Sequence, residues 1–399
     1  MEQKLILIPI PVTALDSTTI ENLEIECFEE FSTKVANFYK LKGLKYQEPL
    51  GLIPGEEDNT VTFTSATING FKKYIKGEEE IPEGGLYTIQ ECLRTQNLDY
   101  RYDIDMTPKF GSYFTMFGLI TKPESLVKTY ENTIELIETE LGVPSESIVV
   151  HKSSEHDVFN ALRDEKVNQH WVEDEIDWYE WEYGEEGVRG EGITIEIPNS
   201  SNPDETQEIG NIVLIYKNNI PIALEWGFGL ETTKSRLEGL PHPIFSSIIG
   251  ERSLYRNNYC INEKDILYLD YANILYHLEE NNIKEGEDRY IDRTIKQLYQ
   301  GLSMQMFLRL RDMSDLESLL GNIKDGLFEN FAGYYYSFQE RVSLFVSSYR
   351  QIISNYKDSR SEKKINKTIN RSAQKYGFNK EQKETIINFI NSLDEKIIV

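Results

Sequence analysis

The pattern of apolar residues changes once along this chain, near residue 240, and that change limits the fold more than any other feature. β-type runs predominate from Val61 to Leu230, whereas almost everything after the segment G-L-P-H-P at residues 239–243 has helical spacing. Strands followed by helices, with a Gly- and Pro-containing break between them, predict an α+β chain. We therefore expect one domain over residues 1–240 and an all-α domain over residues 241–399.

Local patterns add detail to this division. Apolar residues from 19 to 42 recur at helical spacing and predict an amphipathic helix packed against a sheet. A second helical pattern, near residues 124–141, ends at Gly142. The pair Asn218-Asn219 stands between two β-type runs and predicts a tight hairpin turn.

Two further β-type runs, residues 88–94 and 112–118, are joined by a polar stretch with Asp, Asn and Pro, which predicts an antiparallel hairpin with a long loop. Arg94 on one arm and Phe114 on the other could share one face. The planar fork of an arginine suits a phosphate and a carboxylate, and an aromatic ring offers a surface for a purine. The pair indicates activation of an acid by ATP. The alternative is an arginine in a surface ion pair and an ordinary core aromatic ring.

These runs resemble a known family. T-I-Q-E-C-L-R at 88–94 and T-P-K-F-G-S-Y-F-T-M-F-G at 107–118 are similar to the motif 2 hairpin of alanyl-tRNA synthetases, which are class II enzymes. T-V-T-F-T-S-A-T-I-N-G-F-K at 60–72 resembles motif 1 of that family, and L-E-W-G-F-G-L-E-T at 224–232 resembles motif 3. E-I-G-N-I-V-L at 208–214 matches a further block, and residues 270–274 with 287–293 resemble the signature of the helical domain.

The resemblance spans most of residues 20–378 and implies a class II synthetase-like catalytic domain with an antiparallel β-sheet, followed by an all-α helical domain. We expect only these two domains, without the editing and C-terminal domains of full-length relatives. The implied activity is ATP-dependent formation of an aminoacyl adenylate and transfer of the acyl group to an acceptor.

The resemblance also implies site residues. Arg94 is the expected catalytic residue, and it would bind ATP together with Phe114. Glu208 and Glu231 are candidates for ATP binding and for holding a magnesium ion between the phosphates. As isolated acids, both could equally be surface carboxylates. The amino acid is expected to contact four residues: Trp171, Asn211, Glu225 and Gly227.

Several positions depart from the family pattern. Thr232 stands where motif 3 has the arginine that contacts ATP, and a hydroxyl cannot replace a guanidinium. Lys234 or Arg236 is expected to serve instead, although either could be an ordinary helix-surface charge. Thr115 replaces the glutamate of motif 2. Glu225 replaces an aspartate, and with Trp226 beside it we expect a reshaped amino-acid pocket, so alanine is not assumed as the substrate.

The net charge of −25 disfavours nucleic acid over most of the surface, because a protein that binds RNA neutralises phosphates with basic side chains. Basic residues nevertheless gather in one C-terminal stretch, at Lys357, Arg360, Lys363, Lys364, Lys367, Arg371 and Lys375. A solvated helix face explains such a run, and so does contact with a tRNA acceptor stem. The acceptor therefore stays open between tRNA and a small molecule, peptide or carrier protein.

Neither a membrane span nor an export signal is expected, since the apolar run at residues 5–12 is short, so the cytoplasm is the expected compartment. The cysteines, Cys27, Cys92 and Cys260, are far apart and predict neither a disulfide framework nor a cysteine zinc site. The acidic, tryptophan-rich segment at residues 171–186 is expected to be an exposed loop, with Trp171 the exception.

Two functions from different classes remain. One is the synthetase-like ligase described above, which the ordered motifs and Arg94 favour. The other is a non-catalytic paralogue that acts as a binding or regulatory module, which Thr232 and Thr115 favour.

Overall fold

The computed structural model describes residues 27–55, 61–103, 105–163, 169–174, 179–200, 202–258, 260–286, 288–321, 327–356 and 362–397. The apolar run at residues 5–12, the first part of the helix expected from residue 19, and the basic residues Lys357 and Arg360 lie outside these ranges.

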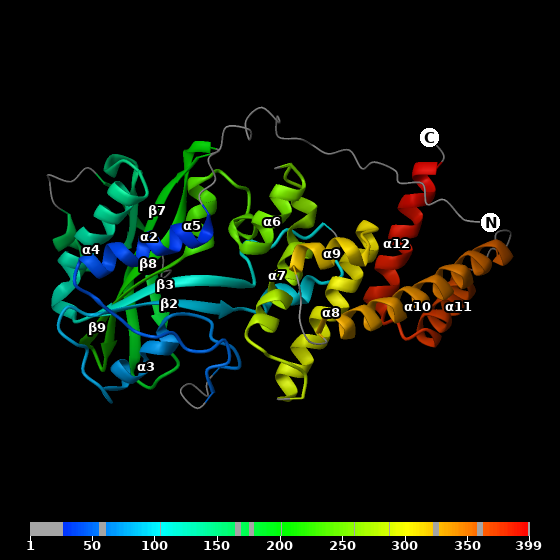
Figure 1. The fold of residues 1–399 in the computed structure, drawn as a ribbon, viewed down its shortest axis with the longest axis horizontal. Coiled ribbons are helices and arrows are strands. Elements are labelled where there is room, and N and C mark those ends of the chain that lie inside the picture. Colours follow the sequence, from blue (N-terminus) through cyan, green and yellow to red (C-terminus); the bar gives the residue numbers. More distant parts are fainter. Residues whose placement is uncertain are drawn as a thin grey trace.

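One mixed sheet organises the first part of the chain (Figure 1). Within the described residues it has nine strands in the order β1-β2-β3-β9-β8-β7-β4-β5, with β6 paired to β7. Only the pairs β1–β2 and β4–β5 are parallel. The strands are β1 (Lys45–Tyr46), β2 (Leu86–Leu93), β3 (Tyr113–Thr121), β4 (Val149–Ser153), β5 (His170–Asp174), β6 (Glu180–Glu182), β7 (Val188–Asn199), β8 (Asn202–Lys217) and β9 (Ile220–Gly229).

Both predicted hairpins are present. β2 and β3 pair antiparallel, with Cys92 opposite Phe114. β8 and β9 are joined by Asn218 and Asn219, whose φ angles of 53° and 64° lie in the left-handed region that a tight two-residue hairpin requires. Asparagine tolerates that region better than most residues, which is why the sequence predicted a turn at this pair.

Helices cover both faces of the sheet (Figure 1). α2 (Phe28–Leu41) and α4 (Leu126–Glu135) pack on one face through a core that includes Phe31, Phe117 and Trp226. α3 (Ile68–Lys76) covers part of the other face through a second core with Phe71 and Ile120. The predicted packing of an amphipathic helix on the sheet is thus confirmed for its described part.

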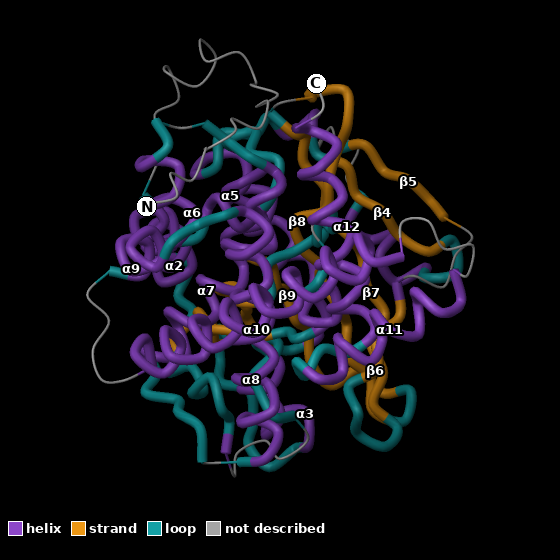
Figure 2. The backbone as a smooth tube through the Cα atoms, turned by 90° about the vertical axis from the view of Figure 1, so that its right-hand side faces the viewer, coloured by secondary structure: helices purple, strands orange, loops and turns teal. Residues whose placement is uncertain are grey.

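A helical region follows the sheet, as predicted, and lies in front of it in Figure 2. The long helix α7 is buried on nearly all sides at the centre of this region, which explains its almost continuous apolar sequence. The helices are α5 (Leu230–Leu237), α6 (Ile248–Arg256), α7 (Ile266–Glu280), α8 (Arg289–Arg309), α9 (Met313–Leu320), α10 (Leu327–Tyr356), α11 (Glu362–Lys375) and α12 (Lys380–Ile397).

Helix α7 is joined to the β2–β3 hairpin by polar and aromatic contacts. Both the backbone N–H and the hydroxyl of Ser112 donate to the Asp270 carboxylate at 2.6 Å. The Tyr113 and His277 rings stack with centroids 3.6 Å apart. Because these contacts and one continuous core cross residue 240, the start of β3 is held by the helical region as well as by the sheet.

Three smaller expectations can be compared with the fold. The acidic segment at residues 171–186 is not only a loop, since it contributes parts of β5 and β6 to the sheet. Cys27, Cys92 and Cys260 are free thiols. Among the helices that the structure describes, none has the length and apolar character needed to cross a lipid bilayer.

Candidate active site

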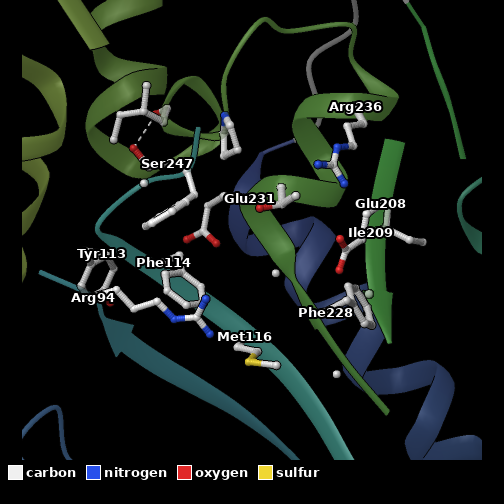
Figure 3. Close-up of a pocket in the computed structure, with 18 of the residues that line it drawn as sticks. Arg94, Tyr113, Phe114, Met116, Glu208, Ile209, Phe228, Glu231, Arg236 and Ser247 are labelled. Atoms are coloured by element: carbon white, nitrogen blue, oxygen red, sulfur yellow. Dashed lines mark hydrogen bonds between the residues drawn. The ribbon is translucent and has the colours of Figure 1, made fainter. Parts of the chain in front are cut away.

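A cavity of about 210 Å³ opens between the β2–β3 hairpin, strands β8 and β9, and the first turns of α5 (Figure 3). In Figure 3, Arg94 and Phe114 lie on one wall, Arg236 and Glu208 lie on the opposite wall, and the Glu231 carboxylate projects between them. The lining residues that matter for its chemistry are Arg94, Phe114, Met116, Glu208, Asn211, Gly227, Glu231, Thr232 and Arg236.

Arg94 and Phe114 share this cavity because of strand register. Cys92 lies opposite Phe114, and the Arg94 N–H donates to Ser112 O just beyond, so alternation places both side chains on one face. The Arg94 guanidinium carbon lies 4.9 Å from the centroid of the Phe114 ring. Its Nε donates to the Ser65 carbonyl at 3.1 Å, and no ion pair to Arg94 is found within the described ranges. The alternative of a surface ion pair therefore does not describe this arginine.

Glu231, in the first turn of α5, is held where β9 ends. The Thr115 N–H donates to both carboxylate oxygens of Glu231, at 3.0 and 2.8 Å. The carboxylate thus takes the place of a backbone carbonyl on a neighbouring strand, since the pairing of β3 with β9 begins only at Met116. Burial raises the pKa of Glu231 to about 7. The carboxylate lines the cavity while it also stabilises the edge of β3.

Arg236 and Lys234 are the two candidates to replace the missing motif 3 arginine, and only Arg236 lines the cavity. Arg236 lies one helical turn after Thr232 on α5, and both residues line the cavity. Its Nε donates to Gln207 at 3.1 Å, while one terminal nitrogen, Nη1, is buried with no hydrogen-bond partner.

Lys234 was also predicted to bind ATP, and the structure places it elsewhere. Its ammonium is only 1% exposed and forms ion pairs with Glu238 at 2.8 Å and Glu251 at 3.0 Å. A residue two positions from Thr232 or Arg236 on a helix faces another direction, so Lys234 stabilises the packing of α5 and α6 and does not line the cavity.

Two polar residues of β8 lie at the opposite wall. Asn211 accepts from the Thr194 hydroxyl at 2.7 Å and donates to Glu208 Oε1 at 2.8 Å, which orients the amide. Glu208 is exposed and free to meet a ligand from the cavity. Two acidic side chains, Glu208 and Glu231, thus reach the same cavity, which is compatible with a magnesium ion that takes its other ligands from phosphates and water.

Glu225 faces the same side of β9 as Gly227 but does not line the cavity. The residue is 7% exposed, and its carboxylate accepts from the Tyr183 hydroxyl at 3.2 Å. Burial raises the pKa of Glu225 to about 7. Tyr183 and Thr67 lie beside Glu225 and were not predicted to be near the site. The alternation W-x-Y at residues 181–183 could have indicated a strand with both rings on one face. The acidic residues around it favoured a loop instead.

Two tryptophans lie away from the cavity, contrary to expectation. Trp171 is on β5, which three strands separate from β9, and its ring packs near Tyr130 at 5.8 Å and under Arg163 at 5.2 Å. Trp226 is fully buried in the core beneath α2 and α4, on the opposite face from Glu225, because adjacent strand residues point to opposite sides. Neither ring shapes an amino-acid pocket next to Glu225.

The raised pKa of Glu225 predicts a pH-dependent stability. Between pH 4.5 and 7 the folded state binds more protons at this carboxyl than the unfolded chain does, so the free energy of unfolding falls as pH rises through this range. Glu225→Gln stays neutral throughout. Between pH 5 and pH 8 we expect the free energy of unfolding of wild type to fall by on the order of 3 kcal/mol relative to that of this variant. Urea unfolding measures both. If the difference in free energy of unfolding between wild type and Glu225→Gln were the same at pH 5 and pH 8, the raised pKa of Glu225 would be contradicted.

Comparisons with known proteins bear on the identity of this chain. Residues 30–208 match the family model of class II tRNA synthetases (A). The alanine–tRNA ligase of Rhodopirellula baltica is 27% identical over 237 residues, which cover 53% of this chain and 24% of that protein. The alanine–tRNA ligase of Fusobacterium nucleatum is 30% identical over 113 residues, or 27% of this chain and 12% of that protein. The matches thus span about a quarter or less of these relatives.

Among solved structures, a pyrrolysyl-tRNA synthetase from Desulfitobacterium hafniense aligns with a TM-score of 0.37 and 12% identity, covering 58% of this chain and 76% of that chain. This likeness is too weak to carry an argument about function. The sequence matches and the family model are stronger, and the sheet with its following helices has the expected α+β arrangement. Residues 30–208 are therefore similar to class II tRNA synthetases, and the chain resembles alanine–tRNA ligases over part of its length.

Proposed function

We propose that this protein activates an amino acid with ATP, forming an aminoacyl adenylate, and passes the acyl group to an acceptor. The observation that carries the proposal is the placement of Arg94 beside Phe114 on the wall of one cavity, without a carboxylate partner for the guanidinium among the described residues. A cation kept free beside an aromatic ring is suited to an anionic nucleotide.

In the proposed reaction, a carboxylate oxygen of the amino acid attacks the α-phosphorus of ATP, and pyrophosphate leaves. Arg94 would hold the α-phosphate and the carboxylate together and stabilise the charge that develops between them. Phe114 would stack on the adenine ring. Arg236 would bind the phosphate tail through its unpartnered Nη1, and Glu208 and Glu231 would hold a magnesium ion that neutralises phosphate charge.

The amino group of the substrate would meet Glu225, with Asn211 and Gly227 along the path from the cavity. A buried carboxylate selects for an ammonium because a ligand without the amine leaves the carboxylate unpaired. Glu225 has no ion-pair partner among the described residues, which supports this role.

The acceptor is either a tRNA acceptor stem or a small molecule, peptide or carrier protein. Exposed basic residues on α11 support tRNA, whereas the net charge of −25 supports the other acceptors. Affinity for tRNA that falls steeply with salt would favour tRNA, because phosphate binding releases counterions. The cytoplasm is the compartment in which we expect this reaction.

Pyrophosphate exchange with a panel of amino acids tests the proposal. We expect ATP to become labelled from pyrophosphate in the presence of ATP, magnesium and at least one amino acid. A folded sample that shows no exchange with any member of the panel would count against activation.

A non-catalytic binding module is the second candidate, favoured by Thr232 and Thr115 at positions where the family has charged residues. Isothermal calorimetry separates the two. A module of this kind would bind ATP or an amino acid with measurable heat and form no adenylate. The ligase would bind both ligands and form the adenylate.

A further inference from the structure

Two glycines lie next to each other on the face of the sheet below the cavity. On β3, Phe114, Met116 and Gly118 alternate on this face. Gly118 pairs with Gly227 of β9, and Met116 pairs with Gly229. Glu225 is the next residue of β9 on the same face, opposite Ile120. Thr67 covers Gly118, so the path from the cavity towards the buried carboxylate runs over Gly227.

The Met116 side chain blocks this path. A Cβ atom built on Gly227 would lie 2.6 Å from the Met116 methyl carbon, which shows that the methyl rests directly on Gly227. Met116 and Gly227 both line the cavity, whereas Glu225 does not. The half-buried thioether therefore stands between the open cavity and the carboxylate.

Behind Met116, the buried Glu225 carboxylate has hydrogen-bond capacity to spare. Tyr183 donates one hydrogen bond to Glu225, although a carboxylate can accept about four. The Thr67 hydroxyl is fully buried beside Glu225, and its contact with the carboxyl lowers the pKa of Glu225. Buried polar groups are normally satisfied, so a ligand with several donors, such as an ammonium, suits the remaining acceptor positions of this carboxylate.

We propose that Met116 is a movable gate over Gly227, which admits the amino group of the acyl substrate to Glu225 and limits the length of the side chain that enters with it. The inference rests on the proposed function. Met116 is the flexible wall, because an unbranched thioether rotates about three bonds, while Thr67 and Tyr183 are anchored in the buried core around α3 and β6.

A homologous series tests the gate: glycine, alanine, 2-aminobutyrate and norvaline, which differ by one methylene at each step. Binding is measured by calorimetry without ATP, so that the result does not depend on adenylate formation. In wild type, affinity should fall as the chain lengthens. In Met116→Ala, affinity for norvaline relative to that for the shortest ligand that binds should rise about 10-fold or more, as expected for removal of a wall that excludes methylenes.

Two matched variants serve as controls. Met116→Leu keeps the volume and should retain the wild-type order of ligands. Met313→Ala removes a thioether on α9, outside the cavity, and should change nothing in the series. Movement of the gate itself is followed by ¹³C-methyl NMR of the six methionines, with the Met116 signal assigned by its loss in Met116→Leu. A bound amino acid should shift that signal in wild type and leave it unchanged in Glu225→Gln.

The outcomes distinguish the gate from the reaction. An unchanged order of ligands in Met116→Ala, or a Met116 signal insensitive to a saturating ligand, overturns the gate even if pyrophosphate exchange is present. The expected order without any exchange supports the gate and overturns the activation step. If neither wild type nor Met116→Ala binds any member of the series, both proposals are overturned.

Discussion

Replacing Arg94 with alanine is expected to lower the rate of amino-acid-dependent pyrophosphate exchange by about 10³-fold or more. The guanidinium is aimed at the position where charge develops on the α-phosphate, and loss of such a preorganised donor acts mainly on the transition state. The fold should survive, because within the described part of the chain this side chain donates a single hydrogen bond, to the Ser65 carbonyl. The measurement is exchange at saturating ATP and amino acid, with thermal unfolding in parallel.

Arg94→Lys refines this test. A lysine keeps the charge but loses the planar fork, so exchange should recover only in small part. Arg163→Ala is the matched control, since Arg163 also lies over an aromatic ring, that of Trp171, but is remote from the cavity. Equal losses of exchange in Arg94→Ala and Arg163→Ala would show that the effect is general and that Arg94 has no special role.

The second large effect is expected at Arg236. Arg236→Ala should weaken ATP binding by about 10- to 100-fold, the loss expected when hydrogen bonds to a charged phosphate are removed. Adding Thr232→Arg to this variant should recover part of the affinity, because position 232 lies one turn earlier on the same face of α5 and lines the same cavity. Calorimetry with ATP and magnesium measures both variants.

Lys234→Met provides the contrast for Arg236. It leaves Glu238 and Glu251 without their shared cation, so it should lower the free energy of unfolding by about 3 kcal/mol while ATP affinity in the folded protein stays unchanged. If Lys234→Met weakened ATP binding and Arg236→Ala did not, the assignment of the two residues would have to be reversed.

Local patterns predicted the parts of this protein that depend on neighbours in sequence. Strand alternation and register placed Arg94 and Phe114 on one face, and the left-handed preference of Asn218 and Asn219 marked the hairpin turn. These predictions succeeded because side-chain direction along a strand, and backbone preference in a turn, are properties of a few consecutive residues.

The same alternation could have prevented one error. Trp226 follows Glu225 directly, so the two side chains point to opposite faces of β9, and only one of them can face a site on that sheet. Trp226 was expected to reshape the pocket because it is next to Glu225 in the sequence, but neighbouring strand residues do not share a face. The choice between Lys234 and Arg236 was different, since both lie on α5, and only the packing of that helix against Glu251 of α6 decided it.

By itself the sequence determined that strands are followed by helices, that two hairpins form, and that Arg94 and Phe114 share one face, because periodicity and turn chemistry are local. Only the tertiary structure decided that Trp171 lies three strands away from β9, that Tyr183 and Thr67 surround Glu225, and that Met116 covers Gly227. Those arrangements depend on strand order and on which segments meet across the sheet. Such long-range contacts arise from the packing of the whole domain and leave no periodic signal in a single stretch of chain.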